Sequence, residues 1–237
     1  MANWSDLSTL IDRAYGTQIS AANRCRLILL EAITRGHLLP GARLIESEIG
    51  DTLAVSRTPL REALSALKAE GIVQNDADGL RIRQLDWRDI HNLYDMRITL
   101  ESMAAKLAAM RASKAEKMVI DNITQTEQQL IQEQAEAIRL ARQNADFHHA
   151  ILKAAQNSFL EEALAKLSRL LILLGSTAYT LPDRVAQIAH EHRAINAAIQ
   201  KNNADEAEAA MRIHLENALS ARLHLLALSG DQPLNLD

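Results

Sequence analysis

Four polar side chains in the second half of the chain have the types and spacing of a metal site. Asn144 and His148 are four residues apart in one helical segment, so they share a helix face. His192 and His214 lie on two later helical segments. Three imidazoles and one side-chain oxygen, brought from three helices into a bundle interior, could bind a divalent metal ion. Zinc is expected first, with nickel and manganese as alternatives.

Spacing alone leaves a second interpretation open. The chain has eight histidines, and a buried histidine is more often a core residue with satisfied hydrogen bonds than a metal ligand. The neighbours His149 and His190 project in other directions from His148 and His192, because adjacent helical residues do not share a face. We therefore expect neither of them to be a ligand.

A second group of residues, in the first half of the chain, has the chemistry of DNA recognition. Arg57 and Arg61 are four apart on a helix predicted over residues 57–70, so they share its solvent face. Arginine can bind phosphates or the edge of a guanine, and the hydroxyl of Thr58 can add a contact. The residues alone fit equally well a surface helix with two solvated arginines. The opposite, buried face is predicted to hold Leu60, Leu64 and Leu67.

The elements around these arginines predict a winged helix-turn-helix. Helices are expected over residues 21–34, 46–53 and 57–70, with Ser56 as the N-cap of the third. Two short strands, 72–73 and 80–83, flank a turn that ends at Gly79. Two strands joined by a tight turn form a wing, where Gly79 permits close approach to a DNA backbone.

Composition predicts a mainly α protein. Apolar residues make up 48% of the chain but aromatic residues only 3%, so alanine, leucine and isoleucine dominate. After residue 86 no strand pattern remains, and an all-helical antiparallel bundle of about six helices is expected. The predicted segments are 87–112, 115–133, 136–156, 158–175, 182–201 and 203–228.

The domain layout follows from these patterns. We expect an N-terminal extension over residues 1–16, a winged helix-turn-helix DNA-binding domain over 17–86, an all-helical domain with the candidate metal site over 87–228, and a flexible tail over 229–237. The net charge of −4 excludes binding to nucleic acid through bulk positive charge. A single cysteine, Cys25, and the lack of a signal-like or membrane-spanning apolar stretch favour a cytoplasmic location, away from membranes.

Three stretches in the first half carry a family resemblance. Residues 38–44 read LLPGARL, residues 55–64 read VSRTPLREAL, and residues 67–73 read LKAEGIV. Together they resemble the winged-helix domain of GntR-family transcription regulators. The resemblance implies a double-stranded DNA operator as partner, with contacts from Arg57, Thr58, Arg61, Arg43 and Gly79. Many relatives also carry an arginine in the second helix, where this chain has Glu46-Ser47-Glu48, so one contact is missing or comes from elsewhere.

The second half carries a resemblance of its own. It has LYDMR at residues 93–97, LE at 100–101, AA at 104–105, and FH at 147–148 with Asn157 nine residues on. With the histidine segments, this pattern resembles the FCD domain of the FadR subfamily. The resemblance implies a helical bundle whose metal ligands are Asn144, His148, His192 and His214. The first ligand is usually aspartate, so the neutral Asn144 implies weaker binding or a metal held loosely until an effector arrives.

In that family the metal helps to hold a small carboxylate effector. Arg97 is the candidate for pairing with it, although an arginine used only in helix pairing fits that position equally well. The resemblance also implies a homodimer on a two-fold symmetric operator, acting most often as a repressor relieved by its ligand. Effector and DNA binding would be coupled by about 1–3 kcal/mol.

Two other functions remain open at this point. A histidine-rich metal site could activate water in a hydrolase-like enzyme. We expect no enzyme, because the sequence shows no histidine–glutamate arrangement positioned as a general base and because an enzyme leaves the Arg57 helix unexplained. Alternatively, the metal could be purely structural, with the second half serving only dimerisation.

Overall fold

The computed structural model describes residues 4–16, 18–175, 177–181 and 183–229. The chain divides into two compact units, which are described separately. One consists of residues 1–85 with 168–175, and the other of residues 86–167 with 176–237. The predicted tail 229–237 lies outside the described residues apart from the backbone of Ser229.

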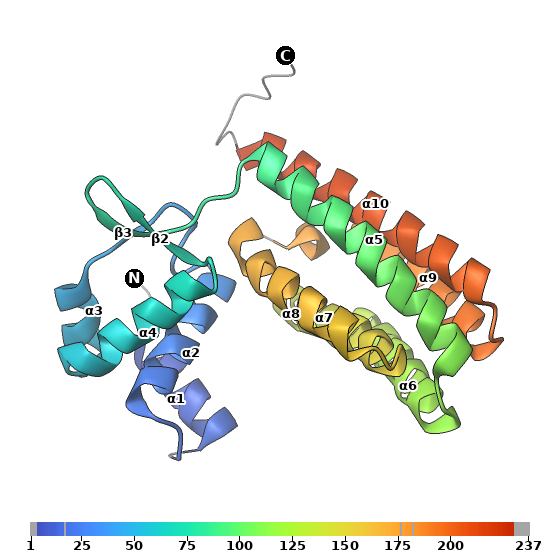
Figure 1. Cartoon of the computed structure of the whole chain (residues 1–237), viewed down its shortest axis with the longest axis horizontal. Helices are drawn as coiled ribbons and strands as arrows, with labels where there is room; N and C mark the ends of the chain where they lie inside the picture. Colours follow the sequence, from blue (N-terminus) through green and yellow to red (C-terminus); the bar gives the residue numbers. More distant parts are fainter. Residues whose placement is uncertain (1–3, 17, 176, 182, 230–237) are drawn as a thin grey trace. The chain divides into compact units, whose positions relative to one another are not determined.

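The first unit is a small helical domain with a three-stranded sheet. Its elements are α1 (Trp4–Tyr15), α2 (Ala21–Thr34), β1 (Arg43–Leu44), α3 (Glu46–Leu53), α4 (Arg57–Ala69), β2 (Val73–Asp76), β3 (Gly79–Ile82) and the 3-10 helix η1 (Leu171–Leu174). The antiparallel strands lie in the order β1-β3-β2 (Figure 1). The winged helix-turn-helix is confirmed, but the prediction of a two-stranded sheet was wrong, because Arg43–Leu44 is too short to show a strand pattern.

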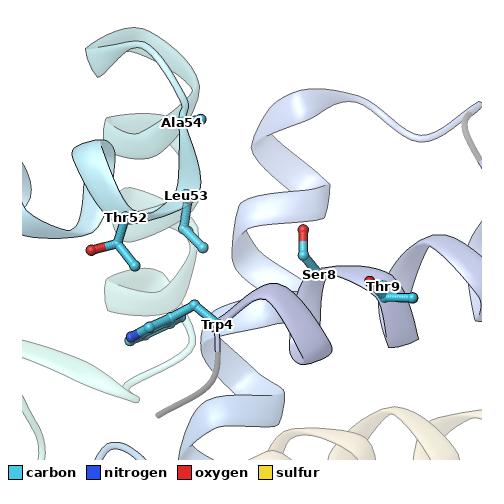
Figure 2. A pocket seen from close by; sticks show the side chains of 6 residues that line it. All are labelled: Trp4, Ser8, Thr9, Thr52, Leu53 and Ala54. Atoms are coloured by element: carbon cyan, nitrogen blue, oxygen red, sulfur yellow. The ribbon is translucent and has the colours of Figure 1, made fainter. Parts of the chain in front are cut away.

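The N-terminal extension forms a helix that belongs to this domain. Leu7 and Ile11 of α1 are buried, and Arg24 of α2 donates to the carboxylate of Asp12 at 2.6 Å. Figure 2 shows Trp4 beside Leu53, at a hollow of about 350 Å³ between α1 and the end of α3. Helix α1 therefore packs against α3, the helix that precedes α4.

The second unit is all-helical. It consists of α5 (Trp87–Arg111), α6 (Lys114–Gln132), α7 (Ala137–Ala154), α8 (Ser158–Leu170), η2 (Ala178–Thr180), α9 (Arg184–Gln200) and α10 (Ala204–Ser229). Helices α5 and α10 run side by side (Figure 1). The six predicted helices are present, but the fourth ends at Leu170 rather than at residue 175, where the chain tightens into η1. None of the described helices is long and apolar enough to cross a membrane.

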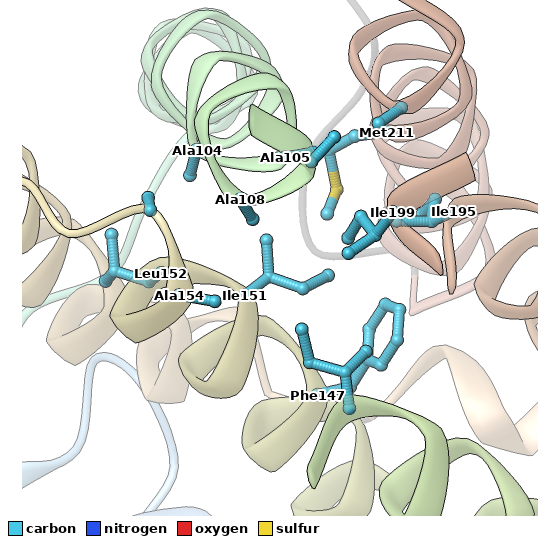
Figure 3. Close-up of a cluster of buried hydrophobic side chains, with 14 of the residues drawn as sticks. Ala104, Ala105, Ala108, Phe147, Ile151, Leu152, Ala154, Ile195, Ile199 and Met211 are labelled. Atoms are coloured by element: carbon cyan, nitrogen blue, oxygen red, sulfur yellow. The ribbon is translucent and has the colours of Figure 1, made fainter. Parts of the chain in front are cut away.

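The core of the second unit brings together the helices that carry the histidines. Phe147 and Ile151 of α7 meet Ile195 of α9 and Met211 of α10 (Figure 3). On α5 the facing residues are small, since Ala104, Ala105 and Ala108 are at most 2% exposed. Small side chains let neighbouring helices approach closely. This packing fixes α7, α9 and α10 around one point.

Candidate DNA-reading helix and histidine centre

Helix α4 has the two faces that the sequence predicts. Leu60, Leu64 and Leu67 are buried, while Arg57 and Arg61 are exposed. Ser56 occupies the N-cap position with an extended backbone, but its side chain makes no capping hydrogen bond. The backbone N–H groups of the first turn therefore do not donate to the Ser56 hydroxyl. A helix N-terminus with such groups favours a phosphate.

Arg61, one of the two exposed arginines of this helix, forms an ion pair. The Nε of Arg61 donates to Oε2 of Glu46 on α3 at 2.8 Å, and this bond raises the pKa of Arg61. The pair is exposed, so it contributes little to stability. It does orient the Arg61 side chain. Helix α3, which carries Glu46 and Glu48, therefore contacts α4 directly.

The structure places Arg43 beside Gly79. Gly79 adopts φ +130°, a conformation that L side chains rarely adopt, and a Cβ there would lie 3.8 Å from Nε of Arg43. Asp78 accepts from Nη2 of Arg81 at 2.8 Å and lies 4.0 Å from Nη1 of Arg43. The pKa of Asp78 is lowered, chiefly by its bond to Arg81. The acidic residue at the wing tip is thus partnered by arginines.

In the second unit, three of the four predicted metal ligands converge. A ligand nitrogen from each of His148 (α7), His192 (α9) and His214 (α10) lies within 4.8 Å of the other two. The Nε2 atoms of His148 and His214 are 3.2 Å apart. The ring of Phe147 stacks on His192 with centroids 4.1 Å apart. The fourth predicted residue, Asn144, lies one turn before His148 on α7 and is partly buried, and its role stays a prediction.

Each histidine has a glutamate at its Nδ1 atom. Nδ1 of His214 is 2.7 Å from Glu191, and Nδ1 of His192 is 2.9 Å from Glu127. Nδ1 of His148 is 2.5 Å from Glu101 but is not in hydrogen-bonding geometry with it. A carboxylate only accepts hydrogen bonds, so a neutral imidazole in this arrangement carries its proton on Nδ1. The Nε2 atoms are then the candidate ligand atoms, and those of His148 and His214 lie within hydrogen-bonding distance of each other, so that one of the two can carry a proton while no ion is bound.

Each glutamate is in turn held by a second polar side chain. Arg97 donates to Glu101 at 2.7 Å, and Arg184 donates to Glu191 at 2.9 Å. The hydroxyl of Tyr179 donates to Glu127 at 3.2 Å. The result is three parallel chains of contacts, each running from an outer donor through a glutamate to a histidine.

Burial and charge set the protonation of this centre. Burial lowers the pKa of His192, and it lowers the pKa of His214 well below the ordinary histidine value. Burial alone raises the pKa of Glu101, but Arg97 and His148 outweigh it and hold that pKa well below its usual range. A neutral histidine and an ionised carboxylate are the forms that a metal centre requires.

The donor set fits a divalent metal ion. Nε2 of His192 is buried and has no hydrogen-bond partner among the described residues. A buried acceptor left without a partner is costly, and a metal ion satisfies it. Histidines whose other nitrogen is bonded to a carboxylate are the usual arrangement in metalloproteins. When bound, the ion would supply a positive charge able to attract an anion.

Sequence reasoning missed the glutamates. The contacts of these carboxylates with the histidines were not predicted; they face Nδ1 rather than lying across the centre as a general base does. Glu191 is adjacent to His192 in sequence but contacts His214, because neighbouring helical residues point about 100° apart. Glu127, 65 residues before His192, gave no local signal. His149 and His190 are exposed, as expected of non-ligands.

Comparison with known proteins assigns a family to each half of the chain. Residues 22–77 match the family of bacterial regulatory proteins called gntR, and residues 92–217 match the FCD domain. The HTH-type transcriptional regulator YdhC of Bacillus subtilis (strain 168) is 27% identical over 199 residues, which are 84% of this chain and 89% of that protein. The probable D-xylose utilization operon transcriptional repressor of Paenarthrobacter nicotinovorans is 29% identical over 210 residues, covering 88% and 91% of the two chains.

Solved structures share the fold. Escherichia coli McbR/YncC superposes with a TM-score of 0.73 at 20% identity, covering 88% of this chain and all of that one. A regulator from Rhodococcus sp. RHA1 gives 0.71 at 22% identity, with coverages of 87% and 99%. A winged helix-turn-helix domain followed by a helical FCD domain is the domain combination of a transcription regulator, not of an enzyme. The chain belongs to the GntR family, whose members bind DNA operators, and carries an FCD domain.

Replacing Arg57 with alanine should weaken operator binding by about 1–3 kcal/mol, because the helix loses a group able to grip a phosphate or guanine. The measurement is fluorescence anisotropy with a labelled operator. Arg212→Ala, which removes an exposed arginine of α10, should bind as the parent does. Parent-like affinity in the Arg57 variant would show that the recognition helix is misassigned.

Replacing Glu127 with glutamine should lower zinc affinity about 10- to 100-fold, since His192 loses the carboxylate that orients it. Competition with a chromogenic chelator measures this affinity. Glu162→Gln, on an exposed part of α8, is the matched control and should leave it unchanged. Equal affinities in both variants would contradict an orienting role for Glu127.

Proposed function

We propose that this regulator holds a divalent metal ion at the histidine centre and binds a small carboxylate beside it, which changes the affinity for operator DNA. The observation that carries the proposal is the convergence of three imidazoles within 4.8 Å, each held at Nδ1 by a glutamate. A histidine buried only for packing has no need of this shared orientation.

His148, His192 and His214 would hold the ion, with Asn144 as the fourth ligand. Imidazole nitrogens suit zinc first, and nickel or manganese as alternatives. Asn144 is neutral, so the ion keeps more positive charge than it would beside the usual aspartate. That charge, together with a nearby arginine, favours a carboxylate as the ligand.

We propose that residues 17–86 read DNA and that residues 87–228 sense the ligand, with residues 1–16 as an extension. Arg57, Thr58 and Arg61 would contact the operator from α4, and Arg43 and Gly79 from the wing. A repressor released by its ligand is the mode we favour; one relative carries the name of a probable repressor. Ligand and operator affinities would be coupled reciprocally.

The experiment that tests this function measures operator binding with and without metal and acid. Zinc-loaded protein is titrated onto an operator selected from random DNA, in the presence of a panel of short carboxylic acids. One class of acid should weaken binding about 5- to 150-fold. His214→Ala should lower metal content and abolish the response, whereas His149→Ala, an exposed neighbour of His148, should preserve both.

Two outcomes would contradict the proposal. Stoichiometric metal in His214→Ala would show that the histidines are not its ligands. An unchanged operator response after metal removal, with loss of thermal stability alone, would make the metal purely structural.

A second copy of the chain is the proposed partner. Met96, Met103 and Met110 follow each other at intervals of seven on α5 and are 49%, 44% and 64% exposed. Residues seven apart share a helix face, so these form an exposed apolar stripe. Such stripes mark interaction surfaces, and a two-fold dimer matches a two-fold operator.

Replacing Met103 with glutamate should therefore shift the protein from dimer toward monomer and weaken operator binding, because a charge enters the centre of the stripe. Sedimentation velocity measures the assembly. Met118→Glu, at an exposed methionine of α6, should leave the dimer intact. A monomeric parent, or a dimer unaffected by Met103→Glu, would rule out this stripe as the interface.

A further inference from the structure

One buried arginine beside the histidine centre is only partly satisfied. Arg184, the first residue of α9, is 4% exposed. Its Nη1 donates to Glu191, but its Nε and Nη2 are buried and have no hydrogen-bond partner among the described residues. Two unsatisfied donors on one buried cation are costly, because each has lost its hydrogen bonds to water without gaining a partner.

The two unused donors form one recognition edge. Nε–H and Nη2–H of a guanidinium point the same way, spaced to match the two oxygens of a carboxylate. The third nitrogen, Nη1, is fixed by Glu191, so the orientation of this edge is set in advance. Glu191 is itself fixed, because it also accepts from Asn217 at 2.7 Å and contacts His214.

Arg184 is therefore linked to the centre through a single carboxylate. One oxygen of Glu191 accepts from Arg184, and the other lies 2.7 Å from Nδ1 of His214. A ligand on Arg184 would act on the same glutamate that orients His214.

The other candidate arginine is engaged differently. Nε of Arg97 donates to Glu101, so the edge that contains this atom is in use. Its guanidinium also stacks over the ring of Tyr94 at 4.9 Å. Arg97 thus orients Glu101 and His148, whereas Arg184 keeps a complete free edge.

The charge of the centre indicates the charge of the ligand. The charged side chains in the three chains of contacts that lead to the histidines are three glutamates and two arginines, namely Glu101, Glu127, Glu191, Arg97 and Arg184. Their formal charge is one negative unit, and a divalent cation makes it one positive unit. A single carboxylate then makes the buried centre neutral, the arrangement that costs least in a low-dielectric interior.

We propose that Arg184 binds the carboxylate of the effector through Nε and Nη2, and that the effector is a small monocarboxylate. This inference rests on the proposed function, because it assigns the ligand of the same centre. It transfers to Arg184 the role that the sequence suggested for Arg97.

The test uses formate, the smallest carboxylate, with its neutral analogue formamide and the dianion malonate as comparisons. Each is titrated calorimetrically into zinc-loaded full-length protein. Formate should bind, formamide should not, and malonate should bind more weakly than formate. Arg184→Lys keeps the charge but loses the two-donor edge, and should weaken formate binding about tenfold or more. Arg193→Lys, an exposed arginine of the same helix, should bind formate as the parent does.

A measurement on the unsubstituted protein covers the case in which Arg184→Lys fails to fold. Formate should shift the ¹⁵N-detected Nε–H signal of a buried arginine in the parent, and formamide should not. No such shift would overturn the assignment.

The remaining outcomes separate this inference from the function it rests on. Formate binding that survives Arg184→Lys but is lost in His214→Ala overturns the role of Arg184 and leaves the metal-linked carboxylate site standing. Tighter binding of malonate than of formate overturns the monocarboxylate assignment. If none of the acids binds the zinc-loaded parent, the carboxylate part of the proposed function fails as well. The metal content of the parent and of His214→Ala then tests separately whether the histidines bind a metal ion.

Discussion

The contact between a buried glutamate and Nδ1 of a histidine is the interaction on which the centre of this protein depends. It occurs three times, from α5 to α7, from α6 to α9, and within the α9–α10 pair. Each contact fixes an imidazole ring and leaves its Nε2 atom as the candidate ligand atom. Because the glutamates are buried, each needs a donor of its own, and Arg97, Tyr179 and Arg184 supply these. The polar centre thereby ties the helices of the bundle together.

The DNA-reading half depends on simpler constraints. Three leucines anchor one face of α4, and this fixes Arg57, Thr58 and Arg61 on the other. The exposed arginines carry little of the stability, so their identity is free to serve recognition. In the second unit the same charges are buried and each must be compensated. The two halves therefore place arginine differently, exposed to solvent on α4 and paired with carboxylates in the core of the second unit.

Interactions between residues that are close in the sequence could be predicted from it, whereas interactions between distant segments could not. The leucine stripe of α4 and the pairing of Asn144 with His148 repeat at helical spacing, so a local pattern reveals them. The convergence of His192 and His214 on His148 needed a family resemblance, because no local pattern places α7, α9 and α10 together. Neither a local pattern nor the family resemblance indicated the roles of Glu127 and Arg184. Their role comes from packing between segments far apart in the chain, as does the pairing of Arg43–Leu44 with β3.

Glu127 and Glu191 set the tautomer of His192 and His214, so that their Nε2 atoms face His148 as ligands. Two-bond ¹H–¹⁵N spectra of the metal-free protein measure this directly, because they distinguish an Nδ1–H from an Nε2–H imidazole. The Nδ1–H form is expected for His192 and His214, and the Nε2 signals of all three histidines are expected to shift strongly when zinc is added. An Nε2–H form at His192 or His214, or spectra unchanged by zinc, would contradict it.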